Sequence, residues 1–306
     1  MSSTTGPPAQ STAEALKSIM GVIIAVPTLV VLLRCYTRLR VSKVFGLDDV
    51  IAIIATVVLI AYACVLLAAA DRGLGRHMEY IEEYGDLSDV SLFSQIAQSL
   101  AIIACTLGKT SFAITLMRIF VQAWALRILW FIIITMNLAN FLCAIFVFVQ
   151  CRDPRALWNF DIISTCWPTY VFTNYSLFVG SYSAAQDFIL ALLPCIIVIK
   201  LNMKMPEKLG IALSLSLGIF AGAAAVVKAT YLVTLSDQSD RFYALPPLFM
   251  WAAAEDALAI VASSLPLLRA LFPTQLTHSF DNYQLQAFEG SKDALDSSTD
   301  DRIQEQ

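Results

Sequence analysis

The chain has 306 residues, of which 58% are apolar and 14% are charged, whereas an average soluble protein has about 25% charged residues. So few charges cannot cover a soluble surface, so the composition indicates an integral membrane protein with the lipid bilayer as its partner. The net charge of −4 comes from residues 281–306, where seven acids and two bases give −5. No basic patch interleaved with aromatic residues is present, so no nucleic-acid partner is expected.

Residues 1–17 are polar and precede the first apolar run without the cationic stretch that starts a signal peptide. The cations Arg34, Arg38 and Arg40 follow that run instead. We therefore expect a polar extracellular N-terminus and a first apolar segment that remains as an uncleaved anchor.

Seven segments are apolar and long enough to cross a bilayer core of about 30 Å as helices. They are residues 18–33, 50–70, 90–119, 128–149, 171–199, 209–235 and 245–268. The first is long enough only if it continues through Cys35 and Tyr36, with the Arg34 side chain extending to the membrane surface. The predicted fold class is all-α, a seven-transmembrane helix bundle over residues 18–271, followed by a disordered acidic tail at 272–306.

Lys and Arg residues near the helix ends divide unequally between the two sides of this bundle, ten against six. The ten are Arg34, Arg38, Arg40, Lys43, Arg118, Arg127, Lys200, Lys204, Lys208 and Arg269, and the six are Lys17, Arg72, Arg76, Arg152, Arg155 and Arg241. Because cytoplasmic loops carry the excess of Lys and Arg, we expect the N-terminus outside and the C-terminal tail in the cytosol.

Five of the seven cysteines lie within or at the ends of the predicted helices, and Cys151 and Cys166 bracket a loop on the outer side. An oxidising compartment permits a disulfide there. Closing a loop of this length stabilises a protein by roughly 3 kcal/mol through the entropy of the unfolded chain. The alternative is a pair of free thiols.

Several short motifs follow one another in a characteristic order. They are RCYTRLR leading into FGLDD, then GLGRH, GKTSFAITLMRI, the loop with Cys151, Trp158 and Cys166, and DFILALLPCIIVIKLNMKMPEK. Over residues 20–272 the chain thereby resembles the fungal rhodopsin-like integral membrane proteins. This family includes pathogenicity-receptor-like proteins and membrane proteins encoded beside mycotoxin biosynthesis genes. The resemblance implies a seven-helix protein of the plasma membrane and supplies no biochemical activity.

Besides Arg118 at the end of the third span, five ionisable residues lie inside the predicted spans, where charge is costly and often functional. They are Lys109, Asp187, Lys228, Glu255 and Asp256. Lys228, Glu255 and Asp256 lie at a similar predicted depth in the membrane, which favours a pair between Lys228 and either acid. Lys109 can approach Asp187 or reach toward Asp48 and Asp49. Such pairs either lock the bundle or form the polar floor of a ligand pocket. Asn137, Asn140, Gln95 and Gln98 can add hydrogen bonds there.

Asp48 and Asp49 open the second predicted span, where acids interact favourably with a helix N-terminus and can cap its free N–H groups. The cations Arg38, Arg40 and Lys43 can neutralise them. Beyond this structural role, Asp48, Asp49, Arg38 and Arg40 are candidates for a cytosolic coupling site that contacts a signalling partner.

Cofactor chemistry has little support in the sequence. The seventh span contains no Lys to form a Schiff base, so we do not expect retinal. His77 and His278 fall on opposite sides of the membrane, so no metal site is expected. In the tail, Ser297 and Ser298 each have an acid three residues on, which makes them phosphorylation candidates.

Three functions remain open. The first is a receptor-like protein that senses an apolar or amphipathic molecule and signals to a cytosolic partner, although motifs typical of G-protein coupling are missing from the third and seventh spans. The second is an accessory membrane protein of a secondary-metabolite (mycotoxin) gene cluster. The third is an intramembrane enzyme using Asp187, Glu255 or Asp256, which ranks last because no residue pattern defines a reaction.

Overall fold

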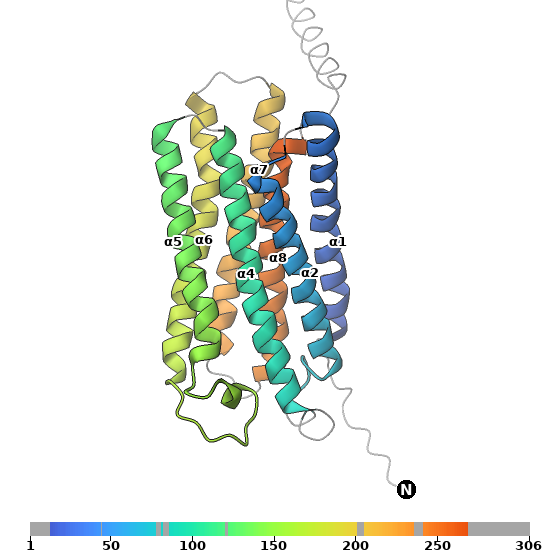
Figure 1. Ribbon diagram of the computed structural model, residues 1–306, viewed down its shortest axis with the longest axis vertical. Coiled ribbons are helices and arrows are strands. Elements are labelled where there is room, and N and C mark those ends of the chain that lie inside the picture. The colour runs from blue at the N-terminus through green and yellow to red at the C-terminus, as the bar shows by residue number, and fades with distance from the viewer. Residues whose placement is uncertain are drawn as a thin grey trace, which may run out of the picture.

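The computed structural model describes residues 13–43, 45–77, 81, 86–119, 122–200, 205–235 and 241–268. Within these residues the protein is all-α, as predicted, and contains seven long helices and no strand (Figure 1). The helices are α1 (Ala13–Tyr36), α2 (Leu47–Asp71), α4 (Leu87–Ile119), α5 (Ala123–Val149), α6 (Thr169–Lys200), α7 (Met205–Leu235) and α8 (Arg241–Leu268). A π-helical turn, η1 (Thr37–Ser42), extends α1, and a short 3₁₀ turn, η2 (Pro154–Leu157), lies between α5 and α6.

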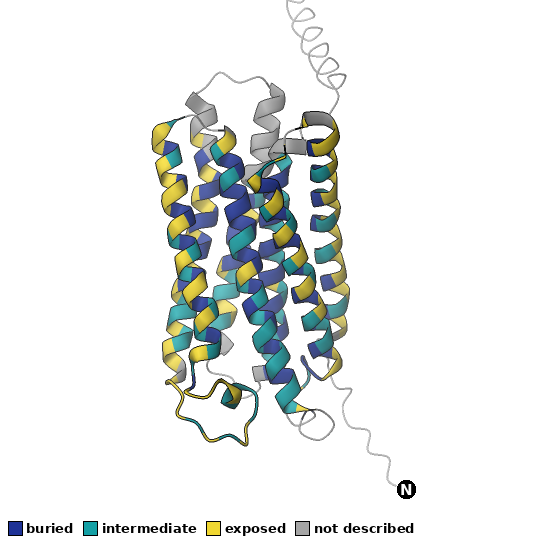
Figure 2. Cartoon of the chain, viewed as in Figure 1, coloured by how far each residue is buried: buried dark blue, intermediate teal, exposed yellow. Residues whose placement is uncertain are grey.

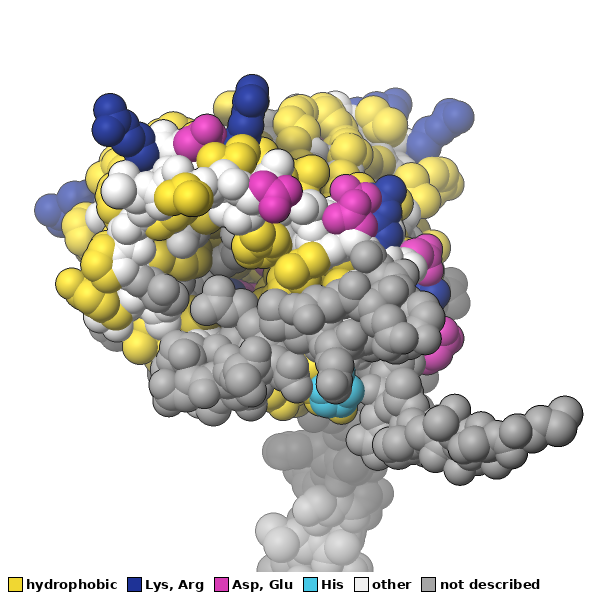
Figure 3. Space-filling view, turned by 90° about the horizontal axis from the view of Figure 1, so that it is seen from below, with side chains coloured by type: hydrophobic (Ala, Val, Ile, Leu, Met, Phe, Trp, Pro, Cys, Tyr) yellow, Lys and Arg dark blue, Asp and Glu magenta, His cyan; other side chains and the backbone are white. Residues whose placement is uncertain are grey.

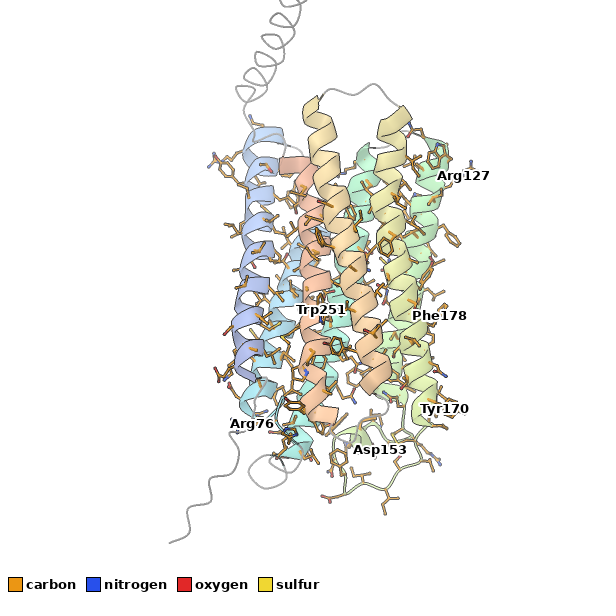
Figure 4. All side chains as sticks on the ribbon, turned by 180° about the vertical axis from the view of Figure 1, so that it is seen from behind. Arg76, Arg127, Asp153, Tyr170, Phe178 and Trp251 are labelled. Carbon is orange, nitrogen blue, oxygen red and sulfur yellow. A yellow bond between two sulfur atoms is a disulfide. The ribbon has the colours of Figure 1, made fainter. Side chains whose placement is uncertain are left out.

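The helices run up and down, so the connections fall at two ends of one elongated bundle. Figure 4 places Arg127 at one end, and Arg76, Asp153 and Tyr170 at the other. This is the division of loops expected from the sequence. Which end faces the cytosol stays a prediction, and we call the end with Arg127 the basic end and the opposite end the disulfide end.

Six helices have both the length and the hydropathy needed to cross a membrane, with mean hydropathies of 1.3 to 3.0 over their apolar windows. The described part of α7 adds a shorter apolar stretch, Ser216–Leu232. The count of seven spans therefore stays a prediction, because α7 does not meet the same criterion over its described residues.

Exposed residues follow the outer faces of the helices (Figure 2), and many of them are large and apolar. Leu29 on α1 is 68% exposed, Phe131 and Phe141 on α5 are each 65% exposed, and Phe220 on α7 is 64% exposed. A soluble protein rarely shows so continuous an apolar surface. Lipid tails match it, so the bundle is an integral membrane protein.

Helices α4 and α8 form the centre of the bundle. In each of them 67% of the apolar window is buried inside the protein, against 22% to 44% in the other candidate spans. One apolar core cluster joins these two helices to α1 and α2, and a second joins them to α5 and α6. Side chains of α4 and α8 that face inward therefore have no access to lipid.

The predicted disulfide between Cys151 and Cys166 is present and closes the α5–α6 connection at the disulfide end. Backbone hydrogen bonds flank it, from the Arg152 N–H to the Thr165 carbonyl at 3.1 Å and from the Trp167 N–H to the Gln150 carbonyl at 2.7 Å. The acidic tail at 272–306, with Ser297, Ser298 and His278, lies outside the described residues, as does most of the N-terminal segment 1–17.

Replacement of Gly218 by Ala is expected to destabilise the contact between α6 and α7. A Cβ at Gly218 would lie 2.6 Å from the Ala191 Cβ, so the two helices must separate. Overpacking of this kind typically costs about 1–3 kcal/mol. The thermal midpoint of the purified protein should fall relative to Gly21→Ala, a control whose added Cβ meets no atom within 4 Å. Equal midpoints for the two variants would contradict a tight α6–α7 contact.

Candidate functional site

A network of buried charges lies in the middle of the bundle, around Lys109 of α4. The Lys109 side chain is 1% exposed. Its Nζ atom lies 2.7 Å from Asp187 Oδ2 on α6, 2.8 Å from Glu255 Oε1 on α8 and 2.6 Å from Ser183 Oγ on α6. The ammonium group therefore donates to acceptors on two other helices. The sequence left two alternatives for Lys109, Asp187 or the acids at the start of α2. In the structure Lys109 pairs with Asp187.

Glu255 joins this pair to a fourth helix. Its carboxylate is fully buried and accepts from the Lys228 ammonium of α7 and, at 2.9 Å, from Ser183 Oγ. The Cys105 thiol of α4 donates to the same carboxylate at 3.4 Å. The pairs that the sequence suggested separately thus form a single network, in which two cations balance two carboxylates across α4, α6, α7 and α8.

A close approach of α4 to α8 makes these contacts possible. Gly108 packs against α8, where an added Cβ would lie at ordinary van der Waals distance, 3.4 Å from Ile260 and 3.5 Å from Ala259. Small residues at helix interfaces let backbones come together in membranes. The next residue of α4, Lys109, is thereby brought within reach of Glu255.

Asp256 follows Glu255 on α8 and interacts with Cys105 of the network, but it forms no ion pair with Lys109 or Lys228. It is 1% exposed, and its Oδ2 atom has no hydrogen-bond partner among the described residues. Successive helix residues point about 100° apart, so Glu255 and Asp256 face different neighbours. Asp256 lines a cavity instead, and the alternative pairing of Lys228 with Asp256 is not observed.

This cavity has a volume of about 100 Å³ and is enclosed by α4, α5, α6, α7 and α8. Its polar lining consists of Gln98, Asn140, Ser176, Ser183, Lys228 and Asp256. The remaining walls are mainly apolar, with Leu232, Leu248 and Phe249 toward the disulfide end. A water molecule takes about 30 Å³ of liquid volume, so the space fits a small polar group or a few waters. Figure 3 looks at the disulfide end, where the described surface is hollowed beside the α5–α6 connection.

Of the four amide residues expected to add hydrogen bonds in a pocket, two line the cavity and two do not. Asn140 and Gln98 line the cavity, whereas the Asn137 side chain donates to Thr110 Oγ1 at 3.1 Å and makes an interhelical contact between α5 and α4. Gln95 does not line the cavity.

A second buried cluster lies at the basic end, around Arg34. Its guanidinium is fully buried, with Nε 2.8 Å from Asp49 Oδ1 and Nη2 2.6 Å from Asp48 Oδ2. The Nη1 atom donates to the Ser263 carbonyl of α8 at 2.7 Å, and Nη2 donates to Thr115 Oγ1 of α4 at 3.2 Å. The expectation that Arg34 extends to the membrane surface is therefore wrong, because two buried carboxylates hold it inside the bundle.

Two further cations complete the Arg34 cluster. Arg38 lies 3.2 Å from both Asp48 Oδ2 and Asp49 Oδ2, and Arg118 Nη1 lies 3.0 Å from Asp48 Oδ1. Asp49 Oδ2 also accepts from the Gly46 N–H at 2.9 Å, so the expected helix-start role coexists with ion pairing.

Two candidate cations at this end stay outside the cluster. Arg40 and Lys43 are exposed. Of the four cytosolic coupling candidates, the structure therefore brings together Asp48, Asp49 and Arg38, whereas Arg40 lies apart from them.

The fold and the two clusters can now be compared with known proteins. The family model described as the fungal rhodopsin domain matches residues 33–274. The chain belongs to this family. The matched range includes both buried clusters and the cavity, so the fungal rhodopsin domain contains all the candidate site residues except Ser297 and Ser298.

Two curated relatives are similar to the chain. The "Fugralins biosynthesis cluster protein 2" of Gibberella zeae is 29% identical over 133 residues, which cover 43% of this chain and 32% of the relative. The "SAT4 family membrane protein" of Emericella nidulans is 26% identical over 230 residues, which cover 72% of this chain and 54% of the relative. The chain thus spans only about a third and about half of the two relatives. No solved structure matches it significantly.

Arg34 is expected to be essential to the bundle at the basic end. Arg34→Gln leaves Asp48 and Asp49 buried with fewer partners, and breaking a buried ion pair typically costs about 3–5 kcal/mol. The exposed Arg40 provides the matched control, because surface substitutions usually change stability by less than about 0.5 kcal/mol. Thermal unfolding in one detergent should show a clearly lower midpoint for Arg34→Gln than for Arg40→Gln. A shared midpoint would mean that the buried pairs do not hold the bundle.

Proposed function

We propose that this fungal rhodopsin-domain protein is a receptor-like membrane protein of the plasma membrane. In this proposal it binds an amphipathic small molecule whose polar group enters the cavity beside Asp256. The observation that carries the proposal is that Asp256 lines the cavity and that its buried Oδ2 atom has no hydrogen-bond partner among the described residues. Leaving a buried polar atom unpaired is costly, so a hydrogen-bond donor from a ligand would satisfy it.

The charges around the cavity indicate the chemistry of that donor. Lys109 and Lys228 are already balanced by Asp187 and Glu255. Asp256 is a fifth ionisable group in the same region, and a ligand hydroxyl or amine would bind it without displacing an existing pair. The small cavity selects a compact polar group, whereas the surrounding apolar walls favour an attached hydrocarbon part.

Helices α4 and α8 offer a route from the cavity to the basic end. Thr115, which contacts Arg34, lies six residues along α4 from Lys109, a rise of about 9 Å. Ser263 lies eight residues along α8 from Glu255, a rise of about 12 Å. A ligand that shifts α8 against α4 would therefore also strain the Arg34 cluster, where Arg118, with 38% of its side chain exposed, is available to a cytosolic partner.

Asp256→Asn is expected to weaken ligand binding, because an amide replaces the carboxylate that accepts from the ligand. Wild-type and variant proteins would be purified from the native host in one detergent, extracted with organic solvent and compared by mass spectrometry. A compound enriched with the wild type should be lost with Asp256→Asn and retained with Asp161→Asn, a control in the exposed α5–α6 loop. Identical extracts from all three proteins would contradict a ligand site at Asp256.

A second candidate function is an accessory role in secondary metabolism, which the name of the Gibberella zeae relative favours. Metabolite profiles of a deletion strain and its parent distinguish the two functions. A receptor that acts on regulation predicts a broad change or none. A single accumulating intermediate would instead support the accessory role, by export or by assistance of one pathway step.

A further inference from the structure

We propose that the ligand reaches the cavity from within the bilayer, through an opening between α6 and α7. This inference rests on the proposed function and adds the path and the form of the ligand. In this arrangement the polar group meets Asp256, while the hydrocarbon chain lies in a groove on the outside of the bundle.

The groove lies on the lipid-facing side of α6 and α7 and has a volume of about 420 Å³. Its lining is mainly apolar, with Leu177, Ala185 and Phe188 from α6 and Val226 from α7. Phe188 and Val226 are 37% and 47% exposed, so the groove is open to the surrounding medium. In a membrane that medium is lipid, so the groove accommodates a hydrocarbon chain.

The groove and the inner cavity are separated by very little protein. Ala229 of α7 lines both of them. On α6, Gly180 and Ser183 line the cavity, while Ser181 and Ala184 line the groove. The two spaces therefore occupy the same level of α6 and α7, on opposite sides of the contact between them.

Gly180 of α6 lies on the cavity side of this wall. A Cβ added there would meet no atom within 4 Å, so open space surrounds this part of α6. At Gly218, nearer the basic end, an added Cβ would lie 2.6 Å from Ala191. The α6–α7 contact is thus tight at Gly218, whereas the cavity leaves open space at Gly180.

The physical properties of the two spaces match one amphipathic occupant. A hydrocarbon chain gains little by leaving lipid for an apolar groove, so the groove directs the chain and the polar cavity supplies the specificity. The bilayer also concentrates such a molecule near the opening. A ligand with a long chain and a compact amine or hydroxyl group satisfies both requirements.

A photoreactive probe tests this path. The probe is a long-chain primary alkylamine with a diazirine close to the amine, added to the full-length protein in phosphatidylcholine nanodiscs. Irradiation and mass spectrometry then locate the cross-links. We expect labels on residues 248–256 of α8, which include the cavity-lining Leu248, Phe249, Ala252 and Asp256, and loss of those labels in Asp256→Asn.

Two variants obstruct the path from different sides. Ala185→Trp fills the groove without lining the cavity, and Gly180→Leu fills the cavity from its α6 side. Their matched controls are Ala25→Trp and Gly21→Leu, at exposed positions of α1. Both path variants should reduce labelling of residues 248–256 several-fold relative to their controls, with unchanged thermal midpoints.

The outcomes separate the path from the proposed function. Undiminished α8 labelling in Ala185→Trp would overturn entry through the groove and leave the Asp256 site intact. Labels confined to the groove in the wild type would identify a lipid site only, which also overturns the path. Two results would contradict the proposed function and the path together. One is a wild-type protein without any label on α8, and the other is an α8 label that Asp256→Asn leaves unchanged.

Discussion

The buried carboxylate of Glu255 is the interaction on which the middle of the bundle depends. It accepts from Lys109, Lys228 and Ser183, and so connects α8 to α4, α7 and α6. A charge in a low-dielectric interior is stable only when it is paired and hydrogen-bonded. Each partner therefore keeps the others in place, and a displacement of one of the four helices at this level changes the contacts of the other three. The cavity lined by Asp256 lies beside this network, and Ser183 and Lys228 belong to both.

The Arg34 cluster gives the basic end a comparable constraint of a different kind. Arg34 is planar and donates in several fixed directions, so it can bind Asp48, Asp49, Thr115 and the Ser263 carbonyl at once. A Lys at this position would provide a point charge without that geometry. The two clusters share α4 and α8, and these are the most buried helices of the bundle. The membrane-spanning region thus contains two rigid polar layers, and the cavity lies beside the layer that is farther from the basic end.

Much of the fold could be predicted because hydropathy depends on local sequence. The apolar runs identified the helices, and two cysteines in one loop identified the disulfide. Arg34 was misjudged because a cation at the end of an apolar run usually reaches the membrane surface; the signal that could have corrected this is the pair of acids at the start of the next helix. The cavity and the different neighbours of Glu255 and Asp256 depend on tertiary packing. The same is true of the difference between Gly180 and Gly218, which no local pattern contains.

The network around Glu255 also constrains how the protein is made. Lys109 precedes Asp187 by 78 residues and Glu255 by 146 residues along the chain. During synthesis α4 therefore reaches the membrane well before either carboxylate is available. Insertion of an unpaired Lys near the centre of a helix costs about 2.5–3.5 kcal/mol on the scale measured for the translocon. Either the apolar residues elsewhere in α4 offset that cost, or α4 stays at the translocon until α6 and α8 have been synthesised. Correct assembly of this bundle is consequently a matter of timing as well as of packing.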